Sequence, residues 1–464
     1  MPSEAAAWEA LVQEHERTHD VFIVTDSPTK FKPDLAGRIT TDMMSGAPRG
    51  TFQANLGADI FGWCAFEVND PAGKLSTRSS RIRSDLASVL DAKGRSAGAF
   101  KHELWPDLLR FTYFSPIRDV CEDEACRFEK PLLAIPLNIH RLNLLYYRSK
   151  QLAEPPNLDA LCPVEGRPQD LRIAVNQEEY FPLGLLFFEN LFLAFLRRDS
   201  PSARVTAERY YDFFAGAEGA VDAQGAPDWE KPVRDALQCL HRMSVITLRE
   251  AGWEKQVNAV AGGAAEVTAM GDWANAHLRE AVREHEVIPT PFPGTEEFFV
   301  FTSDAFPLPI GARFPDEVED LLVTLANPAS QKRFNDLKGS LPAVGLGPRQ
   351  QPFDLNRCAD FLSPQDEPTS GQGFDQARCR NLKDLHEKMP LLATSGLIGF
   401  PGGELREALL DVIEIGDAES LDRAIGVLAR ARTAEFAPFQ ALLATSDIPD
   451  WKPPPRHPLA SRKE

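Results

Sequence analysis

The amino-acid sequence predicts an α/β protein with two domains, and two observations support this. The chain has 464 residues, which is too long for one ordinary hydrophobic core. Helical and strand patterns also alternate from the start, with a helix at 5–16, a strand at 21–24, a helix after Pro33 and a strand ending at Asn55. This alternation implies a parallel sheet with helices on its faces.

Further elements follow along the chain. Strands are expected at 132–137, 144–147 and 171–175, and helices at 180–196, 232–243, 318–325, 328–338, 404–415 and 421–431. The helix at 328–338 has Asn327 as its N-cap, Pro328 at its first position and Gly339 as its stop. The polar residues 138–141 are interpreted as a junction between strands, and 353–380 as irregular.

Composition excludes several classes of function. The chain has 50 Lys and Arg against 68 Asp and Glu, a net charge of −18. Nucleic acid and anionic membranes need basic surfaces, so neither is an expected partner. The most apolar run, 183–196, contains Glu189 and Asn190 and is too short to span a bilayer. We expect a buried helix there.

The seven cysteines show no metal-binding spacing and no Cys-x-x-Cys motif. Local disulfides between Cys121 and Cys126, and between Cys358 and Cys379, are compatible with the sequence. Free buried thiols are the alternative. No metal and no cofactor are expected.

Two motifs together indicate a family. Residues 270–273 read Met-Gly-Asp-Trp at the end of an apolar run, and 334–342 read Phe-Asn-x-x-Lys-Gly-Ser-x-Pro. This order resembles the extracytoplasmic sugar-binding proteins of ABC importers, in the glucose/mannose-type branch of extracellular solute-binding protein family 1. The resemblance covers roughly residues 4–342 and implies a two-lobed, periplasmic-binding-protein-like α/β fold. Such a fold has a cleft between the lobes, and here a helical C-terminal extension would follow.

The resemblance also suggests how the chain is divided. The N-terminal lobe is expected to comprise 1–138 and 275–342, and the C-terminal lobe 139–274 and 343–440. Residues 441–464 form a Pro-rich tail that is expected to be disordered. Hinge motion of the lobes would then enclose the ligand.

A sugar needs flat aromatic side chains for its ring faces and planar polar groups for its hydroxyls. By the resemblance, Trp253 would stack on the sugar, Asp304 would accept hydrogen bonds from two hydroxyls, and Lys338 would donate one. Four further positions match family ligands: Glu4, Gln53, Asn55 and His140. Asn55 stands where relatives carry a His.

Other roles remain open for these residues. Trp253 is compatible with core packing, Asp304 with capping a turn, Lys338 with complementing a helix C-terminus, and His140 with capping a strand end. Asp272 is expected to cap the helix that follows it, with Trp273 packed in the core.

The sequence departs from the family pattern at its start. A paired-tryptophan strand is expected before Glu4, and neither it nor a signal peptide is present. We interpret this as a start assigned too far downstream or a truncated gene. The family's C-terminal His is also missing from 391–397.

The predicted function is that of the sugar-binding component of an ABC importer, a monomeric, extracytoplasmic protein that delivers its ligand to permease subunits without catalysis. One alternative is a degenerate relative that no longer binds sugar and acts as an interaction protein. A glycoside hydrolase, which needs two carboxylates flanking the scissile bond, is a second.

Overall fold

The computed structural model describes residues 2–19, 21, 23, 51, 54–55, 67–69, 76–78, 82–83, 85–112, 132–162, 171–176, 183–214, 228–248, 253–346, 372–393 and 403–434. The chain divides into two compact units, Met1–Ile139 with Thr302–Pro348 and His140–Phe301 with Arg349–Glu464. The chain thus re-enters unit 1 at Thr302. The sequence predicted that it would re-enter the N-terminal lobe at residue 275.

Unit 1 combines short antiparallel strands with helices. Its elements are α1 (Pro2–Thr18), β1 (Ala54–Asn55), β2 (Glu67–Asn69), β3 (Ser76–Arg78), α4 (Leu86–Ala92), α5 (Ala97–Glu103), α6 (Pro106–Thr112), β4 (Ala134–Pro136), β12 (Asp304–Pro307), α14 (Pro315–Leu325), α15 (Pro328–Lys338) and β13 (Leu341–Pro342). Strand β5 (Asn138–Arg141) begins in this unit and continues into unit 2.

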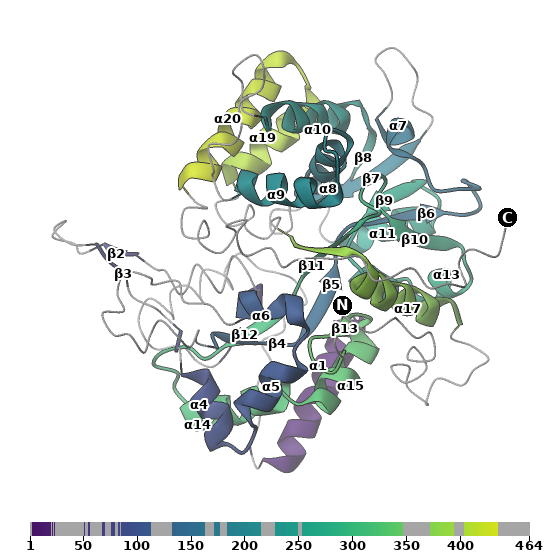
Figure 1. Ribbon diagram of the computed structural model, residues 1–464. Helices are drawn as coiled ribbons and strands as arrows, with labels where there is room; N and C mark the ends of the chain where they lie inside the picture. Colours follow the sequence, from purple (N-terminus) through teal and green to yellow (C-terminus); the bar gives the residue numbers. More distant parts are fainter. Residues whose placement is uncertain are drawn as a thin grey trace. The chain divides into compact units, whose positions relative to one another are not determined.

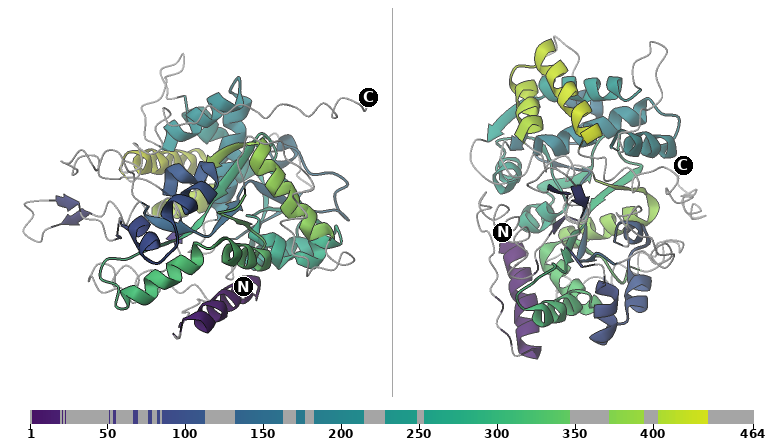
Figure 2. Two further views of the ribbon diagram at one scale, coloured as in Figure 1. Left: turned by 60° about the horizontal axis from the view of Figure 1, so that its bottom comes forward. Right: turned by 90° about the vertical axis from the view of Figure 1, so that its left-hand side faces the viewer.

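The central sheet of unit 1 has the order β1-β12-β4, and both of its pairings are antiparallel. The parallel sheet expected for the N-terminal part is therefore wrong for these strands, because β1 pairs with a strand about 250 residues later rather than with a neighbour. Helix α1 packs along α15, as Figures 1 and 2 show. Trp8 of α1 sits edge-on to Phe306 and Phe334, with ring centroids 5.3 and 4.8 Å away.

Unit 2 is built on a five-stranded mixed sheet in the order β10-β6-β9-β7-β8. Its elements are β6 (Leu144–Arg148), α7 (Leu158–Leu161), β7 (Arg172–Asn176), α8 (Leu183–Arg198), α9 (Ala203–Phe214), α10 (Glu230–Arg242), β8 (Ser244–Leu248), α11 (Trp253–Ala261), β9 (Val267–Ala269), α12 (Trp273–His277), α13 (Arg279–Arg283), β10 (Val287–Pro291), β11 (Phe298–Thr302), α17 (Gln372–Glu387), β14 (Met389–Leu392), α19 (Gly403–Glu414) and α20 (Ala418–Ala434). The two C-terminal helices α19 and α20 pack on α10 (Figure 1).

The predicted buried helix is confirmed as α8, in which every residue from Leu186 to Leu196 is buried. Phe192 in its middle packs against Phe213 of α9 at a centroid distance of 4.7 Å. A helix that is apolar on all sides belongs inside a protein core. None of the helices that the structure describes is long and apolar enough to cross a membrane.

Three other expectations can be compared with the structure. The helix at 328–338 is confirmed as α15, and its N-cap Asn327 accepts a bond from Ala329 N. The polar junction predicted at 138–141 is where the chain passes from unit 1 to unit 2, but it has the conformation of strand β5. Residues from Gln372 onward form helix α17 where irregular chain was expected. The predicted helix after Pro33 and the tail lie outside the described residues.

Candidate functional site

Unit 1 brings together two of the predicted sugar ligands, Asp304 and Lys338. The Nζ atom of Lys338 donates to Asp304 Oδ2 at 2.5 Å. Lys338 is 3 % exposed, whereas the Asp304 side chain keeps 15 % of its surface accessible. A third residue, Asn138, donates from Nδ2 to the same Asp304 oxygen at 2.6 Å. The result is a compact group with one carboxylate, one ammonium and one amide.

The local structure explains how these groups meet. Asp304 is the first residue of β12, and Lys338 is the last residue of α15. Gly339 ends that helix with φ at 90°, a left-handed conformation that glycine adopts without strain. The turn ends the helix directly at Lys338.

Buried amides of α15 hold the adjoining backbone. Gln331 Nε2 donates to the Pro136 carbonyl at 2.8 Å, and Asn335 Nδ2 donates to the Leu137 carbonyl at 2.9 Å. Leu137 N in turn donates to the Asp304 carbonyl at 2.8 Å. The segment that carries Asn138 is thereby fixed to both α15 and β12.

A third predicted ligand is brought to the same strand. In the register of β1 with β12, Asn55 lies directly opposite Asp304. Cα atoms of directly opposed residues in antiparallel strands lie about 4.5–5.5 Å apart. Glu4 lies in the first turn of α1, where its side chain is outside the described residues, as is the whole of Gln53. Their assignments stay predictions.

The predicted ligand His140 belongs to unit 2 and is 3 % exposed. Its Nδ1 is 2.7 Å from Asp272 Oδ1, and its ring meets the edge of Trp273 at a centroid distance of 5.3 Å. The expected helix cap at Asp272 is wrong, because its side chain makes no cap bond. Its carboxylate bonds His140 and Asn381 instead.

Trp253 begins α11 and is partly exposed. Its ring is approached edge-on by Trp273, at 6.5 Å, and by His277, at 5.2 Å. Burial lowers the pKa of His277, with Glu254 acting in the opposite direction. The imidazole of His277 and the indole of Trp273 thus both pack edge-on against the ring of Trp253.

Sequence reasoning missed two residues of these clusters, Asn138 and Arg141. Arg141 is completely buried, bonds Asp384 at 2.5 Å and Asn143 at 3.1 Å, and has its pKa lowered chiefly by burial, against the opposing effect of Asp384. The signal was the run of polar residues at 138–143 inside an otherwise apolar stretch. Polar residues in such a stretch need partners when they are buried.

One disulfide lies outside the two pairings that the sequence suggested. A disulfide joins Cys162 to Cys239 within unit 2, a pairing that the sequence did not suggest. Cys379 is disulfide-bonded as well, while Cys121, Cys126 and Cys358 lie outside the described residues. Among the residues that the structure describes, no group of three His, Cys, Asp or Glu could hold a metal ion.

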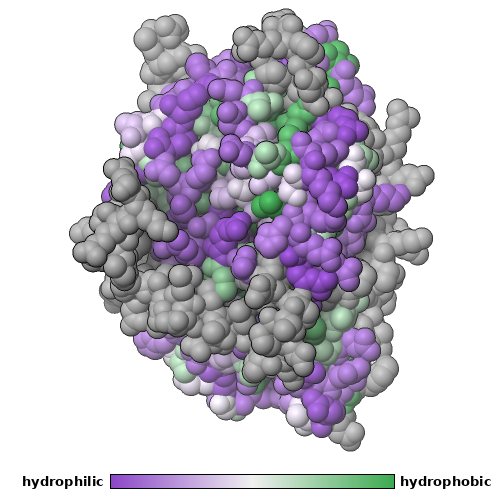
Figure 3. Space-filling view, turned by 90° about the vertical axis from the view of Figure 1, so that its right-hand side faces the viewer, coloured by the Kyte–Doolittle hydropathy of each residue, from purple (hydrophilic) through white to green (hydrophobic). Residues whose placement is uncertain are grey.

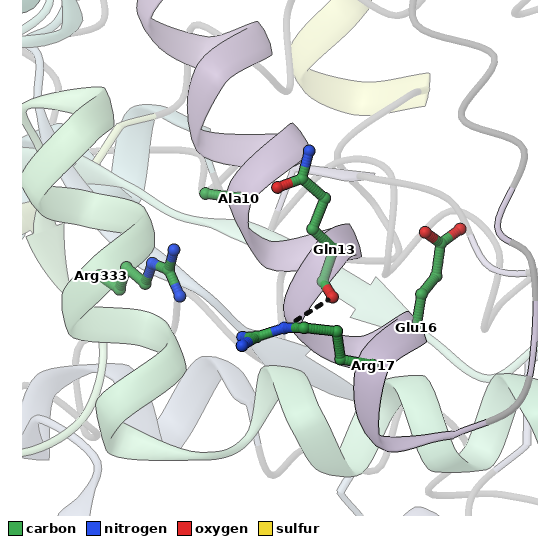
Figure 4. A pocket seen from close by; sticks show the side chains of 5 residues that line it. All are labelled: Ala10, Gln13, Glu16, Arg17 and Arg333. Carbon is green, nitrogen blue, oxygen red and sulfur yellow. Dashed lines mark hydrogen bonds between the residues drawn. The ribbon is translucent and has the colours of Figure 1, made fainter.

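A depression of 610 Å³ is formed by residues of α1 and α15 (Figure 4). It is lined by Ala10, Gln13, Glu16, Arg17 and Arg333. Arg17 Nε donates to the Gln13 carbonyl at 3.4 Å, which turns its guanidinium along its own helix. None of the predicted site residues lines this depression.

One face of the molecule can be inspected for the distribution of polar and apolar residues. On the face in Figure 3, hydrophilic residues cover most of the coloured surface, and apolar residues show in narrow strips among them. This agrees with the acidic composition of the chain.

Two α/β units joined by three passages of the chain define the fold class, that of the two-lobed periplasmic sugar-binding proteins. Among solved structures, the chain is similar to a chitin oligosaccharide binding protein (TM-score 0.59, 16% identity, 92% of this chain and 95% of that one). It is also similar to the solute-binding protein RafE in complex with raffinose (0.56, 13%, 94% and 97%) and to a maltotriose-bound maltotriose binding protein of Thermus thermophilus (0.51, 15%, 92% and 97%).

A curated relative is also found. It is an uncharacterized ABC transporter extracellular-binding protein of Pyrococcus horikoshii, 20% identical over 426 residues, which cover 88% of this chain and 84% of the relative. No family model matches the sequence. These similarities establish the fold, and at such low identity the ligand has to be argued from the residues of the chain.

Proposed function

We propose that this protein is the sugar-binding component of an ABC importer and binds a monosaccharide or small oligosaccharide without making or breaking a bond. The observation that carries the proposal is the group at Asp304 in unit 1. A buried ammonium group stands 2.5 Å from a partly accessible carboxylate, and Asn55 lies opposite that carboxylate in the sheet.

This group has the chemistry that sugar hydroxyls require. Each hydroxyl both donates and accepts, so a carboxylate beside an ammonium can serve adjacent hydroxyls of one ring. Hydrogen bonds to charged groups are shorter and about twice as strong as those between neutral groups. We therefore assign hydroxyl contacts to Asp304, Lys338 and Asn55.

We assign the stacking role to Trp253 in unit 2. Its partly exposed ring, which Trp273 and His277 approach edge-on, offers the apolar surface that a sugar face needs. Glu4, Gln53 and His140 complete the proposed ligand set. Hinge closure of the units would bring the ligands of both onto one sugar.

The names of the similar proteins support the same class of ligand. They refer to raffinose, maltotriose and chitin oligosaccharide, and the curated relative is named as an extracellular-binding protein of an ABC transporter. We propose permease subunits as the protein partners of a monomeric chain and an extracytoplasmic location. The Cys162–Cys239 disulfide supports that location, because disulfides persist in oxidising compartments. Within the sugars, the motifs favour a glucose- or mannose-type ligand.

A thermal-shift screen of the purified chain tests the proposal. Glucose, mannose, galactose, raffinose and maltotriose are added singly, and a ligand that binds the folded state must raise the melting temperature. Asp304→Ala should abolish the shift while the protein still melts cooperatively. Glu317→Ala, which removes an exposed carboxylate from α14, is the matched control and should leave the shift unchanged.

The results separate the alternatives. A shift that survives Asp304→Ala would remove Asp304 from the site. Failure of the wild-type chain to respond to any of these sugars would favour a relative that has lost sugar binding. Hydrolysis of a nitrophenyl glycoside would instead favour the glycosidase.

A further inference from the structure

We propose that Asn138 is a positioning residue that sets the orientation of the Asp304 carboxylate for sugar binding. The inference rests on the proposed function, since it concerns how a ligand of that site is held. Asn138 was not among the ligands predicted from the sequence.

The geometry at Asn138 is a closed pair of hydrogen bonds to one residue. Asn138 Oδ1 accepts from the backbone N of Asp304 at 2.8 Å, and Asn138 Nδ2 donates to Asp304 Oδ2 at 2.6 Å. An amide oxygen only accepts and an amide nitrogen only donates, so rotating the amide by 180° would break both bonds. One planar group therefore fixes the backbone and the carboxylate of Asp304 together.

Asn138 itself is held firmly. It is fully buried, and its backbone lies opposite Pro342 in the pairing of β5 with β13. On the preceding residue, Leu137 N donates to the Asp304 carbonyl and the Leu137 carbonyl accepts from Asn335. Because the Asn138 side chain is short and its backbone is held in place, its amide also holds the Asp304 carboxylate in place.

Lys338 alone cannot fix the orientation of the Asp304 carboxylate. Its ammonium bonds the same Oδ2 atom, but it stands at the end of a flexible chain of four carbons. Lys338 places a positive charge beside the Asp304 carboxylate, whereas Asn138 fixes the orientation of that carboxylate. Holding a side chain in its bound conformation reduces the entropic cost of ordering it when the ligand binds. The Asn138 contact should therefore lower the Kd for the sugar.

A purely structural role for Asn138 is the competing explanation, and two substitutions separate the roles. Asn138→Asp keeps an oxygen to accept from Asp304 N, but it replaces the donor to Oδ2 with a second carboxylate oxygen. Asn138→Ala removes both bonds. The matched control is Asn190→Ala, which removes another buried amide, one whose Nδ2 donates to the Leu186 and Leu142 carbonyls in unit 2.

The experiment is isothermal titration of each full-length variant with the sugar that gives the largest thermal shift, together with urea unfolding. We expect Asn138→Asp and Asn138→Ala each to raise Kd about tenfold or more, by analogy with the cost of ordering a ligand-contacting side chain. Asn190→Ala should lower the urea midpoint and leave Kd within about twofold of wild type, because its described hydrogen bonds lie in unit 2 and share no partner with Asp304.

The outcomes are distinct. The inference is overturned if Asp304→Ala loses binding while both Asn138 variants keep the wild-type Kd. It is equally overturned if Asn190→Ala raises Kd as much as the Asn138 variants, because a general loss of stability would then explain the effect. If wild type binds no sugar, both the proposed function and the inference fail.

Discussion

Removing the disulfide between Cys162 and Cys239 should strongly destabilise the protein. The bridge connects the residue after α7 to the last turn of α10, and the two cysteines are 77 residues apart in sequence. Closing a loop of that length removes about 4.5 kcal/mol of conformational entropy from the unfolded chain, while measured values for disulfides are typically about 2–4 kcal/mol. For Cys162→Ala with Cys239→Ala we expect a loss of roughly 3 kcal/mol, since the smaller measured values include native-state relaxation.

Urea unfolding without reductant, compared with the same experiment in dithiothreitol, provides the assay. Without reductant, the double variant should unfold at lower urea than wild type. With reductant, the two proteins should converge, because the reductant also opens the Cys162–Cys239 bridge of the wild type. Equal midpoints without reductant would refute the reasoning. So would peptide mapping that finds free thiols at Cys162 and Cys239 in the oxidised protein.

Two further predictions test the packing and the titration of individual groups. A Cβ atom at Gly271 would lie 2.1 Å from Cζ3 of Trp273, so Gly271→Ala should cost about 1–3 kcal/mol of stability in urea, whereas Gly98→Ala in an open helical position should cost none. Burial and then His19 lower the pKa of His15 below its ordinary 6.5, so the unfolded state binds more protons and stability should fall as the pH drops below 6.5. His15→Asn should flatten that slope between about pH 7 and pH 5, and an unchanged slope would exclude His15 as its source.

The helices could be predicted from the sequence because their signals are local. The side chain of Asn327, the fixed φ of Pro328 and the freedom of Gly339 act within a few residues of α15, and the structure has all three in those roles. The apolar run at α8, which contains only Glu189 and Asn190 as polar residues before Arg197, was informative for the same reason. These signals require no knowledge of the rest of the fold.

Pairings between distant segments could not be predicted in this way. The register that sets Asn55 opposite Asp304 joins residues about 250 positions apart, and no local pattern specifies it. The disulfide at Cys162 is another example, because connectivity among seven cysteines cannot be deduced from spacing. At Asp272, the local sequence led to a wrong prediction. Its sequence context favoured a helix cap, but the carboxylate bonds His140, a residue 132 positions away.

The polar residues at 138–143 explain why the sequence did not predict a strand at the passage between the units. Their side chains are buried, and their described hydrogen bonds lie within their own unit: Asn138 with Asp304 in unit 1, and His140 with Asp272 and Asn143 with Thr295 in unit 2. A buried polar group without a partner costs about 1–3 kcal/mol, so shifting this strand by one residue would lose several such bonds at once. We infer that polarity here specifies the register of β5, and that the same requirement places Asn138 against Asp304.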